Sequence, residues 1–374
     1  MKKKVIVAGH ICLDITPIFK DKKVEHLEDI LAPGKLVQMG GADVHTGGAV
    51  ANTGLAMKRL GADVRLMGKI GKDAFGDMIL KILKQYEAES DMLISEELST
   101  SYSVVLAVPG IDRIFLHHPG ANHTFQTEDI GEEALKEVSL FHFGYPPLMK
   151  SMYENDGKEL LTLMKKMKSI GIATSMDMAS VDPDSEAGQV DWRAILKQVL
   201  PYVDFFVPSV EELCFMLDQP RFLKWQERAQ GRDITEMLEV EADIRPLAEQ
   251  CMALGAKVLL IKCGAPGMYY CTADREALRP LAEKLPLQVK EWASKQGFEK
   301  SYVPEKIVSA TGAGDTSIAA FLTAMLEGCS LEESLQLAVG TGASCVAAYD
   351  ALSGLRSLEE LREKIKQGWK KKER

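Results

Sequence analysis

The sequence predicts an α/β fold in which helices cover a mostly parallel β-sheet. Short apolar runs, as expected for strands buried on both faces, alternate with longer segments of helical periodicity. The 374 residues are 46% hydrophobic and 26% charged, which is ordinary for a globular protein with a large core. Because no internal repeat or low-complexity tract accompanies this alternation, a sheet with crossover helices explains the pattern best.

The predicted strands are apolar runs of three to five residues that end near glycine, proline or polar residues. They cover residues 5–8, 64–67, 104–108, 140–143, 173–176, 205–207 and 258–261. The segments between them place apolar residues on one helical face, and the clearest cover residues 52–60, 76–85, 158–168 and 192–199.

Four segments depart from this alternation. Residues 15–45 and 98–118 are rich in turn-forming or β-forming residues, and we expect them to be edge hairpins that act as lids over a site. Residues 218–250 and 274–304 are long, charged and mainly helical in pattern, and we expect them to be surface additions. Length alone permits two or three domains, and one domain over residues 1–374, with two lid segments and two helical additions, fits equally well.

Charge and cysteine content exclude several classes of protein. The formal net charge of −9 disfavours a nucleic-acid partner, because phosphates would be repelled. The apolar stretch at the start is broken by His10 and Asp14, and no other stretch reaches a membrane-spanning length. Seven scattered cysteines without a C-x-x-C pair suggest neither disulfides nor a zinc site, so we expect a reducing, cytoplasmic setting.

The strongest local signal for function is the segment Ser309-Ala310-Thr311-Gly312-Ala313-Gly314-Asp315, followed by a helical pattern that stops at Gly328. Glycines before a helix let backbone N–H groups approach an anion, and the helix dipole adds to the attraction. Asp315 at the same helix start is favoured as a carboxylate. Phosphoryl transfer to an alcohol needs this pairing of an anion site with a proton acceptor.

One other interpretation of this segment, and two other kinds of nucleotide-binding motif elsewhere in the chain, compete with this hypothesis. The glycines are also compatible with a plain tight turn, and Asp315 with an ordinary capping residue. A Walker A loop is disfavoured, because the pairs Gly34-Lys35 and Gly68-Lys69 are not followed by Ser or Thr. A dinucleotide-binding fold is disfavoured as well, because no G-x-G-x-x-G follows the first strand.

A second glycine pair, Gly47-Gly48, precedes a helical pattern that contains Asn52 and ends at Gly61. Small residues let a ligand approach the backbone, and Asn52 carries both a donor and an acceptor for a hydroxyl-rich ligand. Simple helix entry explains this segment equally well when it is taken alone.

Taken together, the two glycine segments resemble the ribokinase-like (PfkB) family of carbohydrate kinases, which also contains adenosine-type nucleoside kinases. The C-terminal signature of the family is matched by residues 311–315, and the N-terminal one by Gly47, Gly48, Asn52, Gly61, Gly68, Gly71, Asp73 and Gly76. The resemblance runs from about residue 5 to 355. It implies a three-layer α/β/α domain with a central, mostly parallel sheet and a small β lid.

The resemblance also implies roles for single residues. Asp315 would be the catalytic base, and the backbone amides of Gly312, Ala313 and Gly314 would form the anion hole. The sugar-binding positions are matched by Asp14, Gly48 and Asn52, and on lid closure Arg113 and Asn122 would reach the substrate. The nucleotide-binding positions are matched by Lys262, Gly264, Gly267, Thr311 and Gly342.

The cofactors implied by the resemblance are ATP and Mg²⁺, with Glu212 as the metal-handling residue, acting through water. Two positions depart from the family pattern. Ser209 stands where asparagine is usual, and Ser309 stands where many relatives have aspartate near a monovalent cation. Because main-chain carbonyls can still ligate K⁺, activation by K⁺ is neither predicted nor excluded.

His117, His118 and His123 cluster in the sequence, but they lack the spacing and the supporting ligands of a zinc site. We interpret this stretch as the crossing from lid to core.

The sequence thus predicts an ATP-dependent phosphotransferase that acts on a hydroxyl of a sugar or sugar-like molecule. A nucleoside kinase is one alternative, with Phe115 and Tyr145 as stacking residues. A non-catalytic ligand-binding protein of the same fold is another. Family lids often pair between subunits, so a homodimer through the lid is a further expectation. The sequence names neither the substrate nor the hydroxyl that is phosphorylated.

Overall fold

The computed structural model describes residues 3–19, 27–109 and 114–373. Within these residues, eight strands form a central sheet in the order β14-β13-β12-β11-β10-β9-β1-β4. The six strands from β12 to β4 are parallel, whereas β13 and β14 are added antiparallel at one edge. In sheet order, the bounds are β14 Gln296–Lys300, β13 Gly267–Thr272, β12 Val258–Lys262, β11 Phe205–Phe206, β10 Ala173–Asp177, β9 Val138–Gly144, β1 Lys4–Gly9 and β4 Asp63–Met67.

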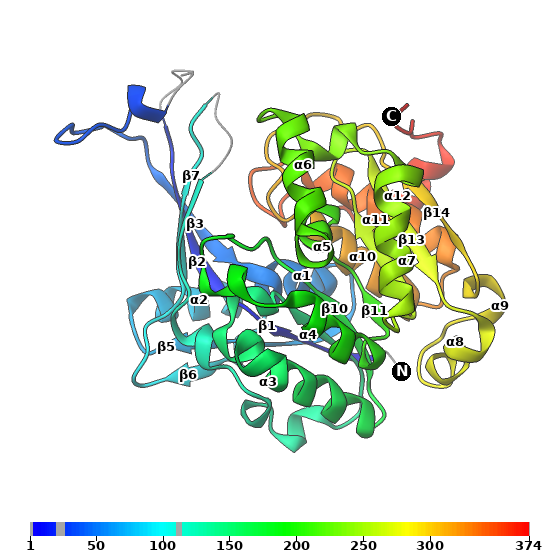
Figure 1. Cartoon of the computed structure of the whole chain (residues 1–374). Coiled ribbons are helices and arrows are strands. Elements are labelled where there is room, and N and C mark those ends of the chain that lie inside the picture. Colours follow the sequence, from blue (N-terminus) through cyan, green and yellow to red (C-terminus); the bar gives the residue numbers. More distant parts are fainter. Residues whose placement is uncertain (1–2, 20–26, 110–113, 374) are drawn as a thin grey trace.

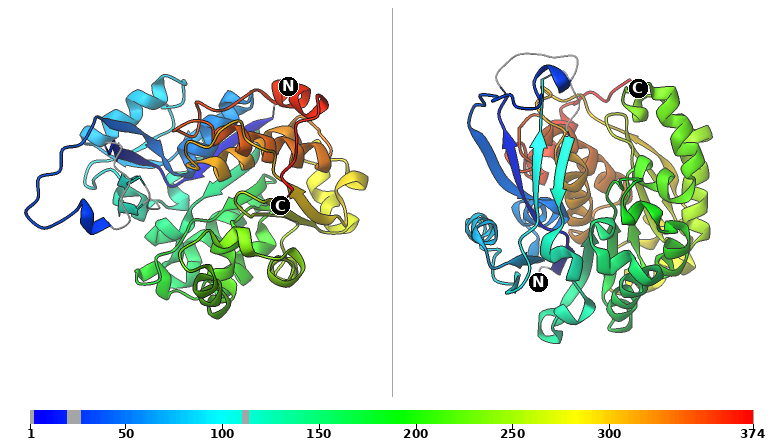
Figure 2. Two further views of the ribbon diagram at one scale, coloured as in Figure 1. Left: turned by 90° about the horizontal axis from the view of Figure 1, so that it is seen from above. Right: turned by 60° about the vertical axis from the view of Figure 1, so that its left-hand side comes forward.

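Helices cover both faces of this sheet, which confirms the predicted α/β class and its three layers. In β1, Val5 and Val7 join one apolar core while Ile6 and Ala8 join the other, because successive side chains point to opposite faces. The first core is closed by α1 Gly48–Arg59, α2 Ala74–Lys84, α8 Arg275–Ala282, α9 Val289–Trp292, α10 Ala313–Leu326, α11 Leu331–Cys345 and α12 Leu358–Lys366. The second is closed by α3 Lys150–Ser169, α4 Trp192–Val199, α5 Val210–Leu217, α6 Gln219–Ala229 and α7 Arg245–Ala253. The left panel of Figure 2 shows the green and the orange helices on opposite sides of the sheet.

A second sheet, which we call the lid sheet, has the order β3-β2-β7-β8. Its strands are β3 Ala42–Gly47, β2 Cys12–Pro17, β7 Tyr102–Leu106 and β8 Ile114–His118, and they extend away from the central sheet in Figure 1. The two segments predicted as lids therefore pair with each other, through the parallel contact of β2 with β7. The run 104–108 was also predicted as a central strand, and this is wrong, because residues 104–106 belong to β7 of the lid sheet, as the lid prediction for 98–118 requires.

The remaining short strands, β5 Lys69–Gly71 and β6 Leu93–Ser95, pair only with each other within the described residues.

The segment 218–250 is helical, as predicted, and contains α6, the short helices Ile234–Met237 and Val240–Ile244, and the start of α7. The prediction for 274–304 is wrong in its last part. After α8 and α9 the chain forms β14, which pairs antiparallel with β13. The sequence of β14 is polar and carries no apolar run, because an edge strand is held by backbone hydrogen bonds and leaves much of its surface to water.

The parallel strands bring several chemically active residues to one edge of the central sheet. β9 ends at Gly144, β10 at Asp177 and β12 at Lys262, and all three strands run in the same direction. The helices α1 and α10 pack against each other on one face. Ligands of open α/β sheets bind at the carboxyl ends of the strands, so this edge is where a site is expected.

Candidate functional site

The start of α10 combines a left-handed glycine with a carboxylate in the first helical turn. Gly312 has φ +72°, and a Cβ there would lie 2.3 Å from the Cβ of Ala351, so only glycine fits. Asp315 follows in the first turn and is buried. Since the first amides of a helix lack intrahelical acceptors, this turn presents N–H groups to an anion.

Three side chains donate hydrogen bonds to the carboxylate of Asp315. The Tyr145 hydroxyl lies 2.7 Å and the Thr53 hydroxyl 3.4 Å from Oδ1, and Nδ2 of Asn52 lies 3.0 Å from Oδ2. Hydrogen bonds of this kind stabilise the ionised form of a carboxylate. These three bonds fix the position of the Asp315 carboxylate.

Tyr145 was not predicted as a partner of Asp315. It follows β9 with φ +68°, a left-handed conformation that is costly for a residue with a side chain. Burial raises the pKa of its phenol well above the ordinary value, and the charge of Asp315 raises it further, so the hydroxyl remains a donor. The signal in the sequence was Tyr145 directly after a central apolar run, at the carboxyl end of a parallel strand.

A buried ion pair lies beside the same helix start. Nζ of Lys262, at the end of β12, is 2.5 and 2.7 Å from the two carboxylate oxygens of Asp177, at the end of β10. Burial alone would lower the pKa of Lys262, but Asp177, Glu212 and Asp315 outweigh it and raise that pKa. A Cβ on Gly314 would lie 3.3 Å from Cδ of Lys262, so the lysine stem passes along the first turn of α10.

Asp177 was missed by the sequence analysis, although it ends one of the predicted strands. A carboxylate at the carboxyl end of a buried parallel strand is the signal that identifies it.

The segment matched to the metal position starts α5. The Ser209 hydroxyl accepts from the Glu212 amide at 3.2 Å, and Oε2 of Glu212 accepts from the Ser209 amide at 2.7 Å, which is a capping box. Both residues and Glu211 line a cavity of about 1080 Å³, which we call the main cavity. Across the described ranges, no three His, Cys, Asp or Glu side chains gather as a ready metal site. A hard cation bound partly through water and phosphate does not need such a cluster, so Glu212 fits that role.

The residues matched to sugar binding, Asp14, Gly48 and Asn52, line the same cavity as Asp315. Asp14 is on β2, and a Cβ on Gly47 would lie 2.1 Å from its Oδ2, so the glycine lets the carboxylate reach the site. Burial raises the pKa of Asp14, and the nearby His45 partly opposes this. Gly48 opens α1 with φ +83°.

The structure brings most of the predicted residues to one cavity of about 1080 Å³. The predicted residues that line it are Asp14, Gly48, Asn52, Glu212, Lys262, Gly264, Thr311, Gly312, Gly314 and Asp315. Ala313 begins α10 between two of them. The cavity is also lined by His10 and His117, which were not predicted as ligand contacts, and by Phe115 and Tyr145, the stacking residues of the nucleoside-kinase alternative.

Three predicted residues have other surroundings, and a fourth is not described. Asn122 is fully buried: its Oδ1 accepts from the Ile11 amide at 3.1 Å, and its Nδ2 donates to the Ile11 and Pro119 carbonyls at 2.8 and 3.1 Å. These bonds hold the turn between β1 and β2, and Asn122 does not line the main cavity. Gly267 permits close pairing of β13 with β14, since a Cβ there would meet the Glu299 carbonyl at 2.2 Å. Gly342 permits close packing of α11 on Ser317. Arg113 lies outside the described residues.

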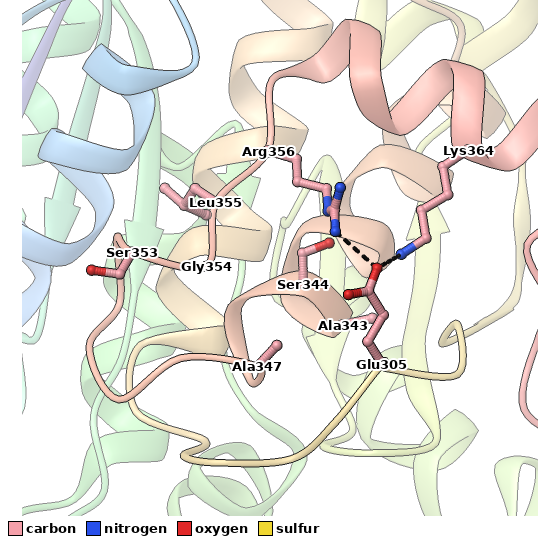
Figure 3. A pocket seen from close by; sticks show the side chains of 9 residues that line it. All are labelled: Glu305, Ala343, Ser344, Ala347, Ser353, Gly354, Leu355, Arg356 and Lys364. Atoms are coloured by element: carbon pink, nitrogen blue, oxygen red, sulfur yellow. Dashed lines mark hydrogen bonds and ion pairs between the residues drawn. The ribbon is translucent and has the colours of Figure 1, made fainter.

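A smaller cavity of about 280 Å³ lies between α11, α12 and the segment before α10 (Figure 3). Ala343 and Ser344 of α11 and Ala347, just after this helix, line one side of it. Oε1 of Glu305 accepts hydrogen bonds from Arg356 and Lys364, each at 2.8 Å (Figure 3).

Among the described residues, no helix is long and apolar enough to cross a membrane.

Comparison with known proteins agrees with this geometry. The family model described as pfkB family carbohydrate kinase matches residues 2–357. An uncharacterised sugar kinase of Archaeoglobus fulgidus is 26% identical over 301 residues, which cover 79% of this chain and 96% of the relative. The 5-dehydro-2-deoxygluconokinase of Clostridium beijerinckii is 22% identical over 371 residues, which cover 98% of this chain and 94% of the relative.

The solved structure of Arabidopsis thaliana ribokinase with ribose and ATP superimposes with a TM-score of 0.69. The superposition covers 98% of this chain and 99% of the ribokinase, at 19% identity. This likeness shows the ribokinase fold, and the family model shows the kinase class. The chain is a carbohydrate kinase and belongs to the PfkB family.

Proposed function

We propose that this chain transfers the γ-phosphoryl group of ATP to a hydroxyl of a sugar or sugar-like substrate, with Asp315 as the catalytic base. The observation that carries the proposal is the position of Asp315. Its carboxylate lies in the first turn of α10, beside the glycine turn at residues 311–314. Its Oδ2 accepts a hydrogen bond at 3.0 Å from Nδ2 of Asn52, one of the residues matched to sugar binding. One group thus borders both an anion site and a hydroxyl site.

The phosphates of ATP would occupy the turn at residues 311–314. The amides of Gly312 and Gly314 would supply donors there, whereas the Ala313 amide donates to the Ala310 carbonyl at 3.3 Å, and Lys262 supplies a positive charge along the first helical turn. Gly264 and Thr311 line the same end of the cavity. Glu212 would hold Mg²⁺ through water, and the metal would offset charge on the transferred group.

The chemistry is an in-line displacement. A substrate hydroxyl held near Asp14, Gly48 and Asn52 loses its proton to Asp315 as its oxygen bonds to the γ-phosphorus. The bond between the γ-phosphorus and the bridging oxygen breaks, and ADP leaves with that electron pair. Positive charge at Lys262 and the amides of α10 stabilise the developing charge on the phosphoryl oxygens.

We also propose that the chain acts as one kinase domain whose lid sheet closes over the cavity. Phe115 and Leu116 on β8 are more than half exposed, although both are apolar. This exposure is consistent with a lid strand that gains contacts on closure or through a second copy of the chain.

The alternative of a binding protein without catalysis is disfavoured by the surroundings of Asp315. A buried carboxylate beside the glycine turn, held by three donors, suits removal of a hydroxyl proton during phosphoryl transfer, which simple binding does not need. A nucleoside kinase remains an alternative, because Phe115, one of its proposed stacking residues, also lines the cavity. The same experiment tests this alternative, since its panel includes nucleosides.

The experiment supplies Mg-ATP with a panel of sugars, sugar phosphates, sugar acids and nucleosides, and measures ADP release. Wild type is compared with Asp315→Asn, which keeps the size of the side chain but is a poor base. We expect turnover with at least one compound and a loss of about 10³-fold or more in Asp315→Asn. Asp63→Asn, at an exposed aspartate of β4, is the control. Wild-type turnover in Asp315→Asn would exclude the base role.

A further inference from the structure

Residues 367–373, which follow α12 and which we call the docked segment, lie along the chain that leads from β14 to the glycine turn. Two backbone hydrogen bonds join these stretches. The Val303 amide donates to the Lys370 carbonyl at 2.9 Å, and the Lys372 amide donates to the Ser301 carbonyl at 2.8 Å. The docked segment therefore pairs antiparallel with the chain just beyond the end of β14.

Aromatic and cationic side chains reinforce this pairing. Trp369 stacks on the buried ring of Tyr302, with the ring centroids 4.5 Å apart and the ring planes at 18°. Nε1 of Trp369 also donates to the Val303 carbonyl at 2.8 Å. Nζ of Lys364 lies 3.9 Å from the centre of the Trp369 ring, and Nζ of Lys371 lies 3.6 Å from that of Tyr302. A cation over an aromatic face is attracted by the ring, so these contacts hold the start of the connection in place.

A second attachment lies at Glu305. Its Oε1 accepts hydrogen bonds at 2.8 Å from Arg356, just before α12, and from Lys364, within α12 (Figure 3). Lys364 is the same side chain whose ammonium covers the Trp369 ring. A single exposed ion pair contributes little to stability, but here one ammonium connects the two attachments. α12 and the docked segment thus hold residues 301–305 together.

The stretch held in this way leads directly into the glycine turn. The amides of Val308 and Ser309 donate to the Val346 carbonyl, just after α11, at 2.7 and 3.3 Å. The Ser309 hydroxyl accepts from the Thr311 amide at 3.2 Å, within the turn itself. Only two residues separate Val308 from Glu305. A displacement at Glu305 would therefore be passed on to the glycine turn.

The described residues 301–309 and 356–373 do not line the main cavity, so they act on a ligand there only through the glycine turn. The family model matches residues 2–357 and thus assigns no role to α12 or to the docked segment. Covering the edge of a sheet is a structural role for such a segment. Positioning of the turn makes a further demand. Whatever binds at the turn must in return stabilise the docked segment, because coupling between two sites is reciprocal.

We propose that Trp369 and Lys364 are positioning residues, which hold the glycine turn in the geometry that receives the phosphates of ATP. They act through residues 301–309 and do not touch a ligand. Docking of the segment and binding of nucleotide are therefore coupled. This inference rests on the proposed kinase function, namely on the binding of ATP phosphates at the glycine turn.

The first test is steady-state kinetics with Mg-ATP and the best acceptor substrate of the panel. Trp369→Ala removes the stack and the hydrogen bond to Val303. We expect kcat/KM for ATP to fall about 10-fold, while the KM of the acceptor substrate stays within about twofold of wild type. Trp369→Phe keeps a stacking ring and should recover most of the loss. Lys364→Met, which keeps the stem without the charge, should change the same parameter as Trp369→Ala.

Leu278→Ala is the control for these variants. Leu278 is fully buried in α8 and lies outside the main cavity, so the change lowers stability without touching the connection to the glycine turn. We expect its kcat/KM for ATP to stay within about twofold of wild type. An equal loss in Leu278→Ala and Trp369→Ala would mean that lower stability alone explains the effect, and it would overturn the inference.

The second test needs no turnover. Isothermal titration of Mg-ADP should give a Kd about 10-fold higher for Trp369→Ala than for wild type. On wild type, saturating Mg-ADP should slow hydrogen exchange at the amides of Val303 and Lys372 by a similar factor, because exchange there requires the docked segment to open. The exchange measurement decides the question even where Trp369→Ala fails to fold.

The outcomes separate the two hypotheses. A Kd within twofold of wild type in folded Trp369→Ala, or exchange that Mg-ADP leaves unchanged, overturns the positioning role and leaves the kinase function standing. Coupled binding and exchange without turnover of any acceptor supports the positioning role and removes the catalytic one. Folded wild type that does not bind Mg-ADP overturns both.

Discussion

The Tyr145 hydroxyl lies 2.7 Å from the carboxylate of Asp315 and reaches it from a backbone with φ +68°. The next peptide N–H along this turn is absent, because Pro146 follows, and the Tyr145 amide donates to the Asp177 carbonyl at 3.2 Å. Strained residues of this kind persist where the surrounding contacts determine them, and they cluster at functional sites. Tyr145 thus connects the end of β9 to the proposed base.

Tyr145→Phe removes this hydrogen bond and keeps the ring. A hydrogen bond to a charged group contributes about 1.5–3 kcal/mol, so we expect kcat to fall about 10- to 100-fold with little change in the KM of ATP. Steady-state kinetics measures this. Tyr86→Phe, at a tyrosine outside the cavity lining, should leave kcat unchanged. A kcat within twofold of wild type in Tyr145→Phe would show that Asp315 does not depend on Tyr145.

Lys262→Met leaves Asp177 buried without its cation. Removing one partner of a buried pair costs about 3–5 kcal/mol, so the free energy of unfolding should fall by this amount, and activity should fall with it. The double variant Asp177→Asn/Lys262→Met should regain part of the stability but not the activity. Urea unfolding and ADP release measure the two effects. Lys72→Met breaks the exposed pair with Glu96 and should cost less than about 1 kcal/mol. If the double variant is no more stable than Lys262→Met alone, the pair is not coupled as described.

Ser209→Ala should lower the free energy of unfolding by about 1 kcal/mol, because it removes the cap of α5. Ser209→Asn restores the residue usual in the family and keeps a capping side chain, so stability should stay within about 0.5 kcal/mol of wild type. Thermal or urea unfolding checks both. A large loss in Ser209→Asn would mean that the position has contacts specific to serine.

His142 gives stability a defined dependence on pH. Burial lowers its pKa from 6.5 to about 3, with a smaller effect of Lys262, while its Nδ1 lies 2.9 Å from the Ser175 hydroxyl. Its contribution is therefore complete above pH 6.5, and it is lost as the pH falls from 6.5 towards 3, since only the unfolded state binds the proton. Across pH 6 to 4, this slope approaches about 1.4 kcal/mol per pH unit.

His142→Leu should flatten the pH dependence of the free energy of unfolding in this range, as measured by urea unfolding at pH 7, 6, 5 and 4. Phe143→Leu, in the next position of β9, should lower stability by a similar amount at every pH. A slope in His142→Leu equal to that of wild type would mean that His142 is protonated in the folded protein as well.

Much of the fold was readable from the sequence because its strands are buried on both faces. The runs at residues 5–8, 173–176 and 258–261 are continuous apolar stretches, and each forms a strand of the central sheet. The strand β14 was missed because an edge strand needs no apolar run. The run 104–108 was assigned to the wrong sheet because its composition reports burial and β-propensity but not which neighbour it pairs with.

The site was predictable where backbone conformation dictates residue type. Gly48 and Gly312 both have positive φ and admit no Cβ, so glycine is required at both positions and the two motifs can be recognised in the sequence. The hydrogen bonds to Asp315 were not predictable: the position of Tyr145 after a strand and the motif around Asn52 place both residues near a site, but a bond between residues 145 and 315 leaves no local pattern. Asn122 was assigned to the substrate by resemblance. Its hydrogen bonds with Ile11 join residues 111 positions apart, so no local sequence pattern predicts them either.

The donors to Asp315 lie 263, 262 and 170 residues away along the chain. A partly folded chain that has formed only one half of the sheet holds an incomplete base, however much helix it contains. During refolding, catalytic activity should therefore return with the last docking event between the N-terminal and C-terminal parts and lag behind the recovery of secondary structure.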